Sequence, residues 1–222
     1  MNIVGFLPNS FVDYPKNISA VIFTGGCNFD CTYCHNKWTI DARGEWVLDE
    51  ILQKIEKNAS FLDAVTITGG EPTLQSLEKL QNAIAKIKAL GLKVKLDTNG
   101  SNPEKLEKLL ASLDYVAMDV KAPLEKYSLI TPISGKTINR IAQSIHLIMG
   151  GTKGYEFRTT FAPELSLADI EEIAQTIKGA KRYFIQKYSP IEGREDKPHK
   201  KEYAEQALQV ASTWVPTFLR GY

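Results

Sequence analysis

The chain has 222 residues, of which 43% are hydrophobic and 24% charged, a composition typical of globular proteins that argues against disordered and collagen-like classes. Its formal net charge of +1 gives no reason to expect nucleic acid or an anionic membrane as a partner. No apolar run approaches the roughly 18 residues of a membrane span, and the N-terminal residues do not resemble a signal peptide. We therefore expect one domain over residues 1–222, located in the cytoplasm.

Six segments rich in β-branched and aromatic residues predict strands, and each ends in glycine, proline or polar residues. They cover residues 20–23, 64–68, 94–98, 115–120, 156–161 and 182–186. The intervals between these segments are long enough for a crossover helix in each case. Because parallel strands need such connections, we expect the strands to pair in parallel.

The intervals carry apolar residues at helical spacing. Clear stripes cover residues 48–55, 77–87, 106–113 and 170–177, and weaker ones cover 137–149 and 201–212. Asn102 and Pro103 predict an N-cap and a first-turn proline, and Ser166 with Asp169 predicts a capping box. Six strand-helix units predict an α/β fold, either a parallel barrel or an open doubly wound sheet. A closed eight-unit barrel needs about 250 residues, so we expect an open, partial (β/α)6 TIM-like barrel.

The cysteines of the chain are the first indication of chemistry. All three, Cys27, Cys31 and Cys34, lie within eight residues after the first predicted strand. A tightly clustered, odd set in a cytosolic protein indicates metal binding rather than disulfides. Three thiolates can hold three corners of an iron-sulfur cubane and leave one iron open to a small molecule. Zinc is the alternative, although His35 directly follows Cys34 and adjacent residues rarely reach one tetrahedral ion.

Polar clusters follow the next predicted strands, where the active sites of parallel α/β proteins lie. They are the segments 69–72 (Gly-Gly-Glu-Pro), 97–100 (Asp-Thr-Asn-Gly) and 119–121 (Asp-Val-Lys). Taken singly, the first two could be turns that end strands, and the third could be a surface ion pair. Their position at successive strand ends is harder to explain by turns, and it favours one shared cavity.

The cysteine spacing, with Tyr33 just before Cys34, resembles the motif of the radical S-adenosylmethionine (SAM) superfamily. The resemblance implies that Cys27, Cys31 and Cys34 bind a 4Fe-4S cluster and that residues 1–222 form one radical SAM core domain. The iron of this cluster that has no cysteine ligand would chelate SAM, and reductive cleavage of SAM gives a 5′-deoxyadenosyl radical. Gly69, Gly70 and Glu71 resemble the element that holds the SAM amino group. Tyr33 would pack near the cluster and the adenine.

A closer resemblance is to the activating enzymes of glycyl radical enzymes, above all those of anaerobic ribonucleoside-triphosphate reductase. Residues 9–15, 34–36, 97–100 and 119–121 resemble segments of these proteins. The resemblance implies that Asp97, Thr98 and Asp119 bind a monovalent cation beside the SAM carboxylate and that Lys121 contacts this carboxylate. It places Arg158 and Ser189 near the ribose and adenine, although relatives often have a histidine near the position of Ser189.

The function implied is that of an activase, which abstracts a hydrogen atom from a glycine of a partner enzyme, here anaerobic ribonucleotide reductase, with flavodoxin or ferredoxin as electron donor. No cysteine remains for a second cluster, which disfavours peptide-maturing radical enzymes. Two alternatives stay open. One is a small-molecule radical SAM enzyme that resembles a deazaguanine-forming synthase, and the other is a non-catalytic metal-binding module.

Overall fold

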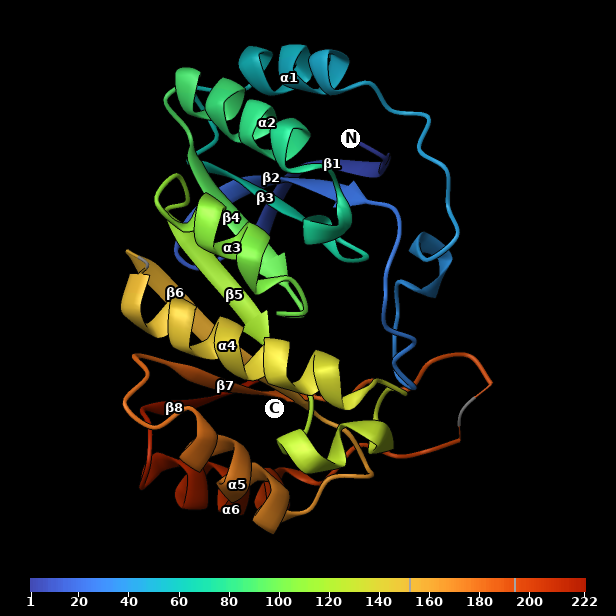
Figure 1. Cartoon of the computed structure of the whole chain (residues 1–222), viewed down its shortest axis with the longest axis vertical. Coiled ribbons are helices and arrows are strands. Elements are labelled where there is room, and N and C mark those ends of the chain that lie inside the picture. The colour runs from blue at the N-terminus through green and yellow to red at the C-terminus, as the bar shows by residue number, and fades with distance from the viewer. Residues whose placement is uncertain (152, 194) are drawn as a thin grey trace.

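The computed structural model describes residues 1–151, 153–193 and 195–222. Its strands form one sheet in the linear order β1 to β8, so that β1 and β8 are the two edge strands of an open barrel (Figure 1). The strands are β1 (Ile3–Tyr14), β2 (Asn17–Thr24), β3 (Ala64–Gly69), β4 (Lys93–Thr98), β5 (Tyr115–Asp119), β6 (Gly154–Phe161), β7 (Tyr183–Lys187) and β8 (Thr217–Arg220). From β2 to β8 all pairings are parallel, whereas β1 is antiparallel to β2.

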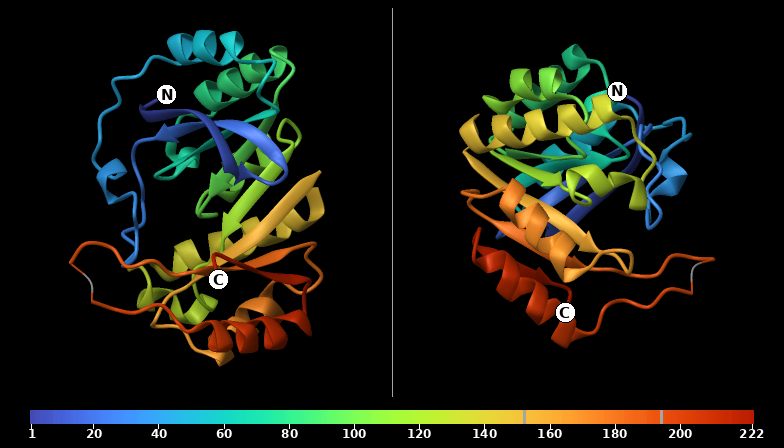
Figure 2. Two further views of the ribbon diagram at one scale, coloured as in Figure 1. Left: turned by 180° about the vertical axis from the view of Figure 1, so that it is seen from behind. Right: turned by 60° about the horizontal axis from the view of Figure 1, so that its bottom comes forward.

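The helices alternate with the parallel strands and lie on the outer side of the curved sheet, as the views in Figures 1 and 2 show. They are α1 (Leu48–Lys57), α2 (Leu77–Ala89), α3 (Pro103–Leu110), α4 (Gly135–Gly151), α5 (Leu167–Thr176) and α6 (Lys201–Ser212). The expected partial (β/α)6 barrel is therefore confirmed, and β2 to β7 correspond to the six predicted strands. Within the described ranges, every helix is too short or too polar to traverse a lipid bilayer.

Two strands were not predicted. The first, β1, contains Pro8 and Asn9 and pairs with β2 through several register irregularities, so that it lacks a regular alternation of apolar and polar residues. The last, β8, has only four residues, which is too few for a periodicity to be recognised. β1 adds an antiparallel strand at one edge of the sheet, and β8 adds a parallel strand at the other edge. Both extend the sheet and leave the six strand-helix units unchanged.

The helix ends follow the predicted signals with one exception. Pro103 is the first residue of α3, and Ser166 with Asp169 forms the expected capping box of α5. Asn102 occupies the predicted N-cap position of α3, but its side chain makes no capping hydrogen bond: its amide donates to the hydroxyl of Thr73 at 2.9 Å, and its side-chain oxygen accepts from Arg140. The asparagine thus ties two loops together instead of closing its own helix.

The two faces of the sheet differ in chemistry. Alternate residues such as Ile22, Ile67 and Leu96 are fully buried and belong to the main hydrophobic cluster, to which the helices contribute. The neighbouring positions on the opposite, concave face include Lys95 and Glu156, which are charged and buried. The main apolar core therefore lies outside the barrel, and the barrel interior combines buried charges with a small apolar cluster of Tyr14, Ala64, Tyr115 and Ala117.

Candidate active site

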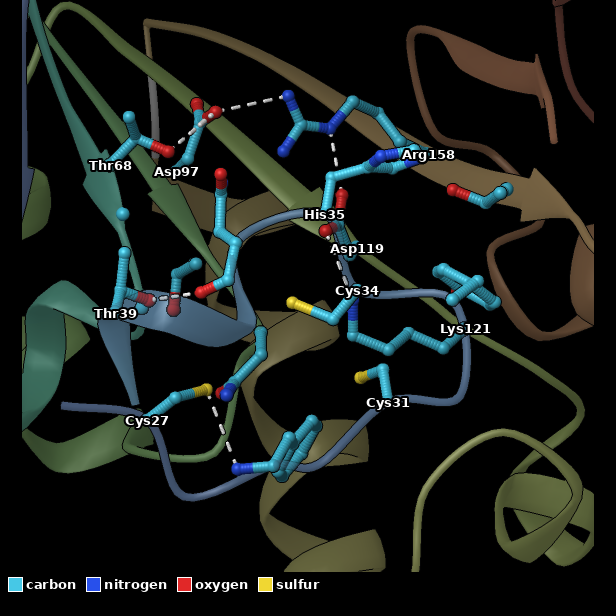
Figure 3. A pocket seen from close by; sticks show the side chains of 18 of the residues that line it. Cys27, Cys31, Cys34, His35, Thr39, Thr68, Asp97, Asp119, Lys121 and Arg158 are labelled. Atoms are coloured by element: carbon cyan, nitrogen blue, oxygen red, sulfur yellow. Dashed lines mark hydrogen bonds and ion pairs between the residues drawn. The ribbon is translucent and has the colours of Figure 1, made fainter. Parts of the chain in front are cut away.

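A cavity of about 330 Å³ opens at the carboxyl end of the strands (Figure 3). Most of its wall consists of the loop after β2 and the ends of β3 to β6, and β1, β2 and β7 contribute Asp13, Phe23 and Gln186. All of the predicted site residues line it except Glu71 and Ser189. The predicted residues that line it are Cys27, Cys31, Tyr33, Cys34, Gly69, Gly70, Asp97, Thr98, Asp119, Lys121 and Arg158.

The cysteine loop is held in place by backbone hydrogen bonds at several points. Gly26, at a φ of +92°, donates to the carbonyl of Thr39 at 2.8 Å, and Thr32 donates to the carbonyl of Ile130 at 2.9 Å. Figure 3 shows the side chains of Cys27, Cys31 and Cys34 around one space. As they stand, no three metal-ligating side chains of the described residues enclose a common point. The donor set nevertheless fits an iron-sulfur cluster, because three soft sulfur atoms line one cavity.

The thiols of Cys27 and Cys31 are shifted toward their neutral form. Burial raises the pKa of Cys27 to about 11 and also raises the pKa of Cys31, while the positive charge of Lys121 acts in the opposite direction on both. Metal ligation requires thiolates. Cluster binding should therefore release protons, and Lys121 is the side chain of the cavity that favours this release.

Glu71 does not line the cavity but lies behind it, fully buried. Its carboxylate accepts hydrogen bonds from the backbone and hydroxyl of Thr73, the hydroxyl of Thr98 at 2.9 Å and the backbone of Asn99 at 2.6 Å. Burial raises the pKa of Glu71, and these donors oppose that rise. Glu71 therefore fastens the end of β3 to the end of β4 and fixes the two loops that carry Gly70 and Thr98.

Five charged side chains form a chain of ion pairs across the strand ends, shown in part in Figure 3. Lys95 lies 2.6 Å from one oxygen of Asp97, and Arg158 lies 3.1 Å from the other. Arg158 also lies 2.8 Å from Asp119, whose second oxygen is 3.2 Å from Lys121. Burial disfavours the charged form of both carboxyls. The positive charges of Arg158 and Lys95 outweigh burial at Asp97, and those of Arg158 and Lys121 outweigh it at Asp119. The pKa of each aspartate is therefore lowered.

Within this series of ion pairs, Lys121 is the end member that faces the cysteines. Its backbone N–H donates to the hydroxyl of Tyr127 at 3.0 Å, and its ammonium lies 6.0 Å from the ring centroid of Tyr33. Burial lowers the pKa of Lys121, but Asp119 more than compensates, so that the ammonium stays charged. The cavity therefore presents one cation between the thiols and the carboxylates, which suits it to receive a carboxylate ligand.

Ser189 is exposed, and its carbonyl oxygen lies 3.1 Å from Nε2 of His35. The contact joins the cysteine loop to the segment after β7. The lining residues Thr160 and Gln186 come from β6 and β7, where sequence resemblance had placed contacts to the adenosyl group. Lys95 was not predicted, because a lysine in a strand is ordinarily expected on a solvated face.

Comparisons with known proteins agree with this geometry. The sequence profile of the radical SAM superfamily matches residues 21–177. A protein of Methanocaldococcus jannaschii that bears the name glycyl-radical enzyme activating enzyme is 41% identical over 197 residues, covering 84% of this chain and 79% of that protein. The pyruvate formate-lyase-activating enzyme of Streptococcus mutans is 30% identical over 197 residues, covering 80% and 73%.

Among solved structures, Streptococcus suis SuiB bound to S-adenosylmethionine superposes with a TM-score of 0.67 at 16% identity. The match covers 88% of this chain but 48% of SuiB, so the chain spans about half the length of that protein. At this identity the likeness concerns the fold.

Proposed function

This chain belongs to the radical SAM superfamily and, within it, to the glycyl-radical enzyme activating enzymes, and from that premise we propose that it installs a glycyl radical on a partner protein. The partner that sequence resemblance favours is anaerobic ribonucleoside-triphosphate reductase, with flavodoxin or ferredoxin as electron donor. The observation that carries the proposal is that Cys27, Cys31, Cys34 and Lys121 line one cavity with Asp97 and Asp119.

In this proposal the three cysteines hold a 4Fe-4S cluster, and the cavity beside them holds SAM. When bound at the three cysteines, the cluster would supply the electron for reductive cleavage of SAM and so the radical chemistry that removes a hydrogen atom from the glycine Cα. Lys121 binds the SAM carboxylate, because its charged ammonium faces the thiols from within the cavity. Gly70 leaves room for the close approach of the ends of β2 and β3, which a side chain would prevent.

Glu71, Thr98 and Asn99 preorganise the floor of the SAM site. Their hydrogen bonds lie within the protein and do not depend on a ligand. Fixed geometry matters here, because an adenosyl radical reacts with whichever hydrogen lies nearest and the substrate must be held at near-contact distance. A glycine loop suits this task, since glycine allows a backbone to bend tightly into a narrow site.

The test is made anaerobically with reduced protein, SAM and the glycyl radical enzyme of the same genome. We expect a glycyl doublet by electron paramagnetic resonance and release of 5′-deoxyadenosine in matching amount. Cys31→Ala should lack both signals, because the described chain has no spare thiol. Consumption of a small metabolite with deoxyadenosine release, while the protein partner stays silent, would favour a small-molecule enzyme. Colourless protein with bound zinc would favour a metal-binding module.

A further inference from the structure

Lys95 is a charged residue whose burial the proposed reaction does not explain. Its side chain is 2% exposed, in the middle of β4 on the concave face of the sheet. A buried ammonium is costly unless it is paired and hydrogen-bonded. Lys95 forms an ion pair with a carboxylate oxygen of Asp97 at 2.6 Å and donates a hydrogen bond to the backbone carbonyl of Asp13 at 2.6 Å.

Lys95 cannot itself contact a ligand in the main cavity. It does not line that cavity, and instead lines a smaller one of about 220 Å³ between β1 and the strands β6 to β8. Asp97, in contrast, faces the main cavity. Any effect of Lys95 on a bound molecule must therefore pass through Asp97.

Each carboxylate oxygen of Asp97 and Asp119 has a cationic side chain of the protein within 3.2 Å, although the Asp97 oxygen beside Lys95 accepts no hydrogen bond from the described part of the chain. Lys95 lies at one oxygen of Asp97, and Arg158 lies at the other together with the hydroxyl of Thr68 at 3.4 Å. Asp119 has Arg158 at one oxygen and Lys121 at the other. Within this series of ion pairs, three cations face two carboxylates, and Lys121 is the cation at the end of the series.

We propose that Lys95 is a positioning residue that, together with Arg158, supplies the positive charge on Asp97, so that this protein binds SAM without a monovalent metal cation. The inference rests on the proposed function insofar as it concerns SAM. In its structural part it is independent of that function, because the ion pairs are present in the protein alone. Lys95 also ties Asp97 to β1 through the carbonyl of Asp13, which restricts the carboxylate to one orientation.

The first experiment measures SAM binding by calorimetry on the cluster-loaded protein, in choline, sodium or potassium chloride at equal ionic strength. We expect the wild-type affinity to be the same in all three salts. Lys95→Met should bind roughly tenfold more weakly in choline, and potassium should restore part of the loss. Lys95→Arg should retain the wild-type behaviour. Lys93→Met is the matched control, since Lys93 is exposed on the same strand and should change nothing.

The second experiment needs neither cluster nor SAM and so separates this inference from the proposed function. The thermal unfolding temperature of the cluster-free wild type should be equal in choline chloride and potassium chloride. The unfolding temperature of Lys95→Met should be higher in potassium chloride, because potassium binds beside the Asp97 oxygen that has lost its ammonium partner. A wild type that gains affinity or stability specifically from potassium would overturn the inference. A Lys95→Met variant that is salt-insensitive and binds SAM normally would also overturn it.

Discussion

At the scale of single residues, the site separates groups that face the ligand from groups that hold them. Lys121 and Asp119 line the cavity, whereas Glu71 is fully buried behind it and accepts its hydrogen bonds from Thr73, Thr98 and Asn99. The sequence motif contains both kinds of residue without distinguishing them. Burial and hydrogen-bond partners make the distinction: Lys121 lines the cavity, which supports the proposed ligand contact, whereas Glu71 holds the loops behind it.

Lys121→Met should leave the iron content of the protein unchanged and weaken SAM binding, because the ammonium is proposed to act on the SAM carboxylate and not on the cluster. A charge-assisted hydrogen bond contributes roughly 1.5–3 kcal/mol, so the dissociation constant should rise about tenfold to a hundredfold. Calorimetry with cluster-loaded protein measures the change. Lys136→Met, at an exposed position, serves as control. Loss of iron in Lys121→Met, or unchanged affinity, would mean that the carboxylate binds elsewhere.

The candidate site could be predicted largely from motifs, because residues at the ends of successive parallel strands must face one another. The burial of Lys95 and the salt bridges of Arg158 could not be predicted from the sequence. Lys95 precedes Asp97 by two positions on β4, so both lie on the same face of the strand, but sequence alone does not show that this face is enclosed. The partners of Arg158, Asp97 and Asp119, come from β4 and β5, and only the sheet order brings them to β6.

At the scale of elements, the alternation of strands and helices was predictable because the apolar face of each helix packs on the apolar face of the sheet. The edge strands β1 and β8 lack this signal. In β1, Phe11 and Val12 are exposed at 67% and 85%, so that apolar residues do not mark a buried face there. The position of β1 depends on contacts distant in sequence, among them the one between Lys95 and the carbonyl of Asp13.

The close approach of two strand ends gives the prediction at this scale. A Cβ atom on Gly70 would overlap the carbonyl group of Gly26, the residue directly before Cys27, and would also touch the Cys27 side chain at 3.3 Å. Gly70→Ala should therefore displace the cysteine loop and lower the amount of iron bound after anaerobic reconstitution by severalfold. The backbone of Gly26 cannot yield as a flexible side chain could.

Gly135→Ala is the control for this variant, because a Cβ atom there meets open space. Iron and sulfide analysis of both proteins, together with the absorbance of the reconstituted cluster, measures the difference. If Gly70→Ala takes up as much iron as the wild type and Gly135→Ala, the ends of β2 and β3 have more freedom than their packing indicates.

At the scale of the whole molecule, the apolar core and the chemistry occupy opposite faces of one sheet. The helices cover the outer face, while the concave face holds the ion pairs and opens to the cavity. The barrel is open between β1 and β8, which are its two edge strands. The concave face has a small apolar cluster, of Tyr14, Ala64, Tyr115 and Ala117, beside its buried charges, so its stability depends in part on charge.

This dependence on charge predicts how stability changes in acid. The pKa of each of four aspartates, Asp97, Asp114, Asp119 and Asp169, is lowered: burial opposes the shift, but basic partners and hydrogen-bond donors outweigh it. A carboxyl whose pKa is lower in the folded state stabilises the fold above its unfolded value of 3.8, and this contribution is lost as the pH falls below it. Glu71 acts in the opposite direction, because burial raises its pKa and folding then favours its protonated form.

The four aspartates and Glu104, whose pKa is also lowered, outnumber Glu71. The free energy of unfolding should therefore be nearly constant from about pH 7 to about pH 5 and should fall below about pH 4. Asp119→Asn tests the contribution of the ion-pair chain. The variant should be less stable than the wild type at neutral pH, because Arg158 and Lys121 lose their shared counter-ion, and the two proteins should converge as the wild-type carboxyl becomes protonated. Urea unfolding of the cluster-free proteins over this pH range measures both curves. Asp49→Asn, whose side chain is 66% exposed, should follow the wild type throughout. A constant difference between wild type and Asp119→Asn at every pH would show that Asp119 stabilises the barrel by shape and not by charge.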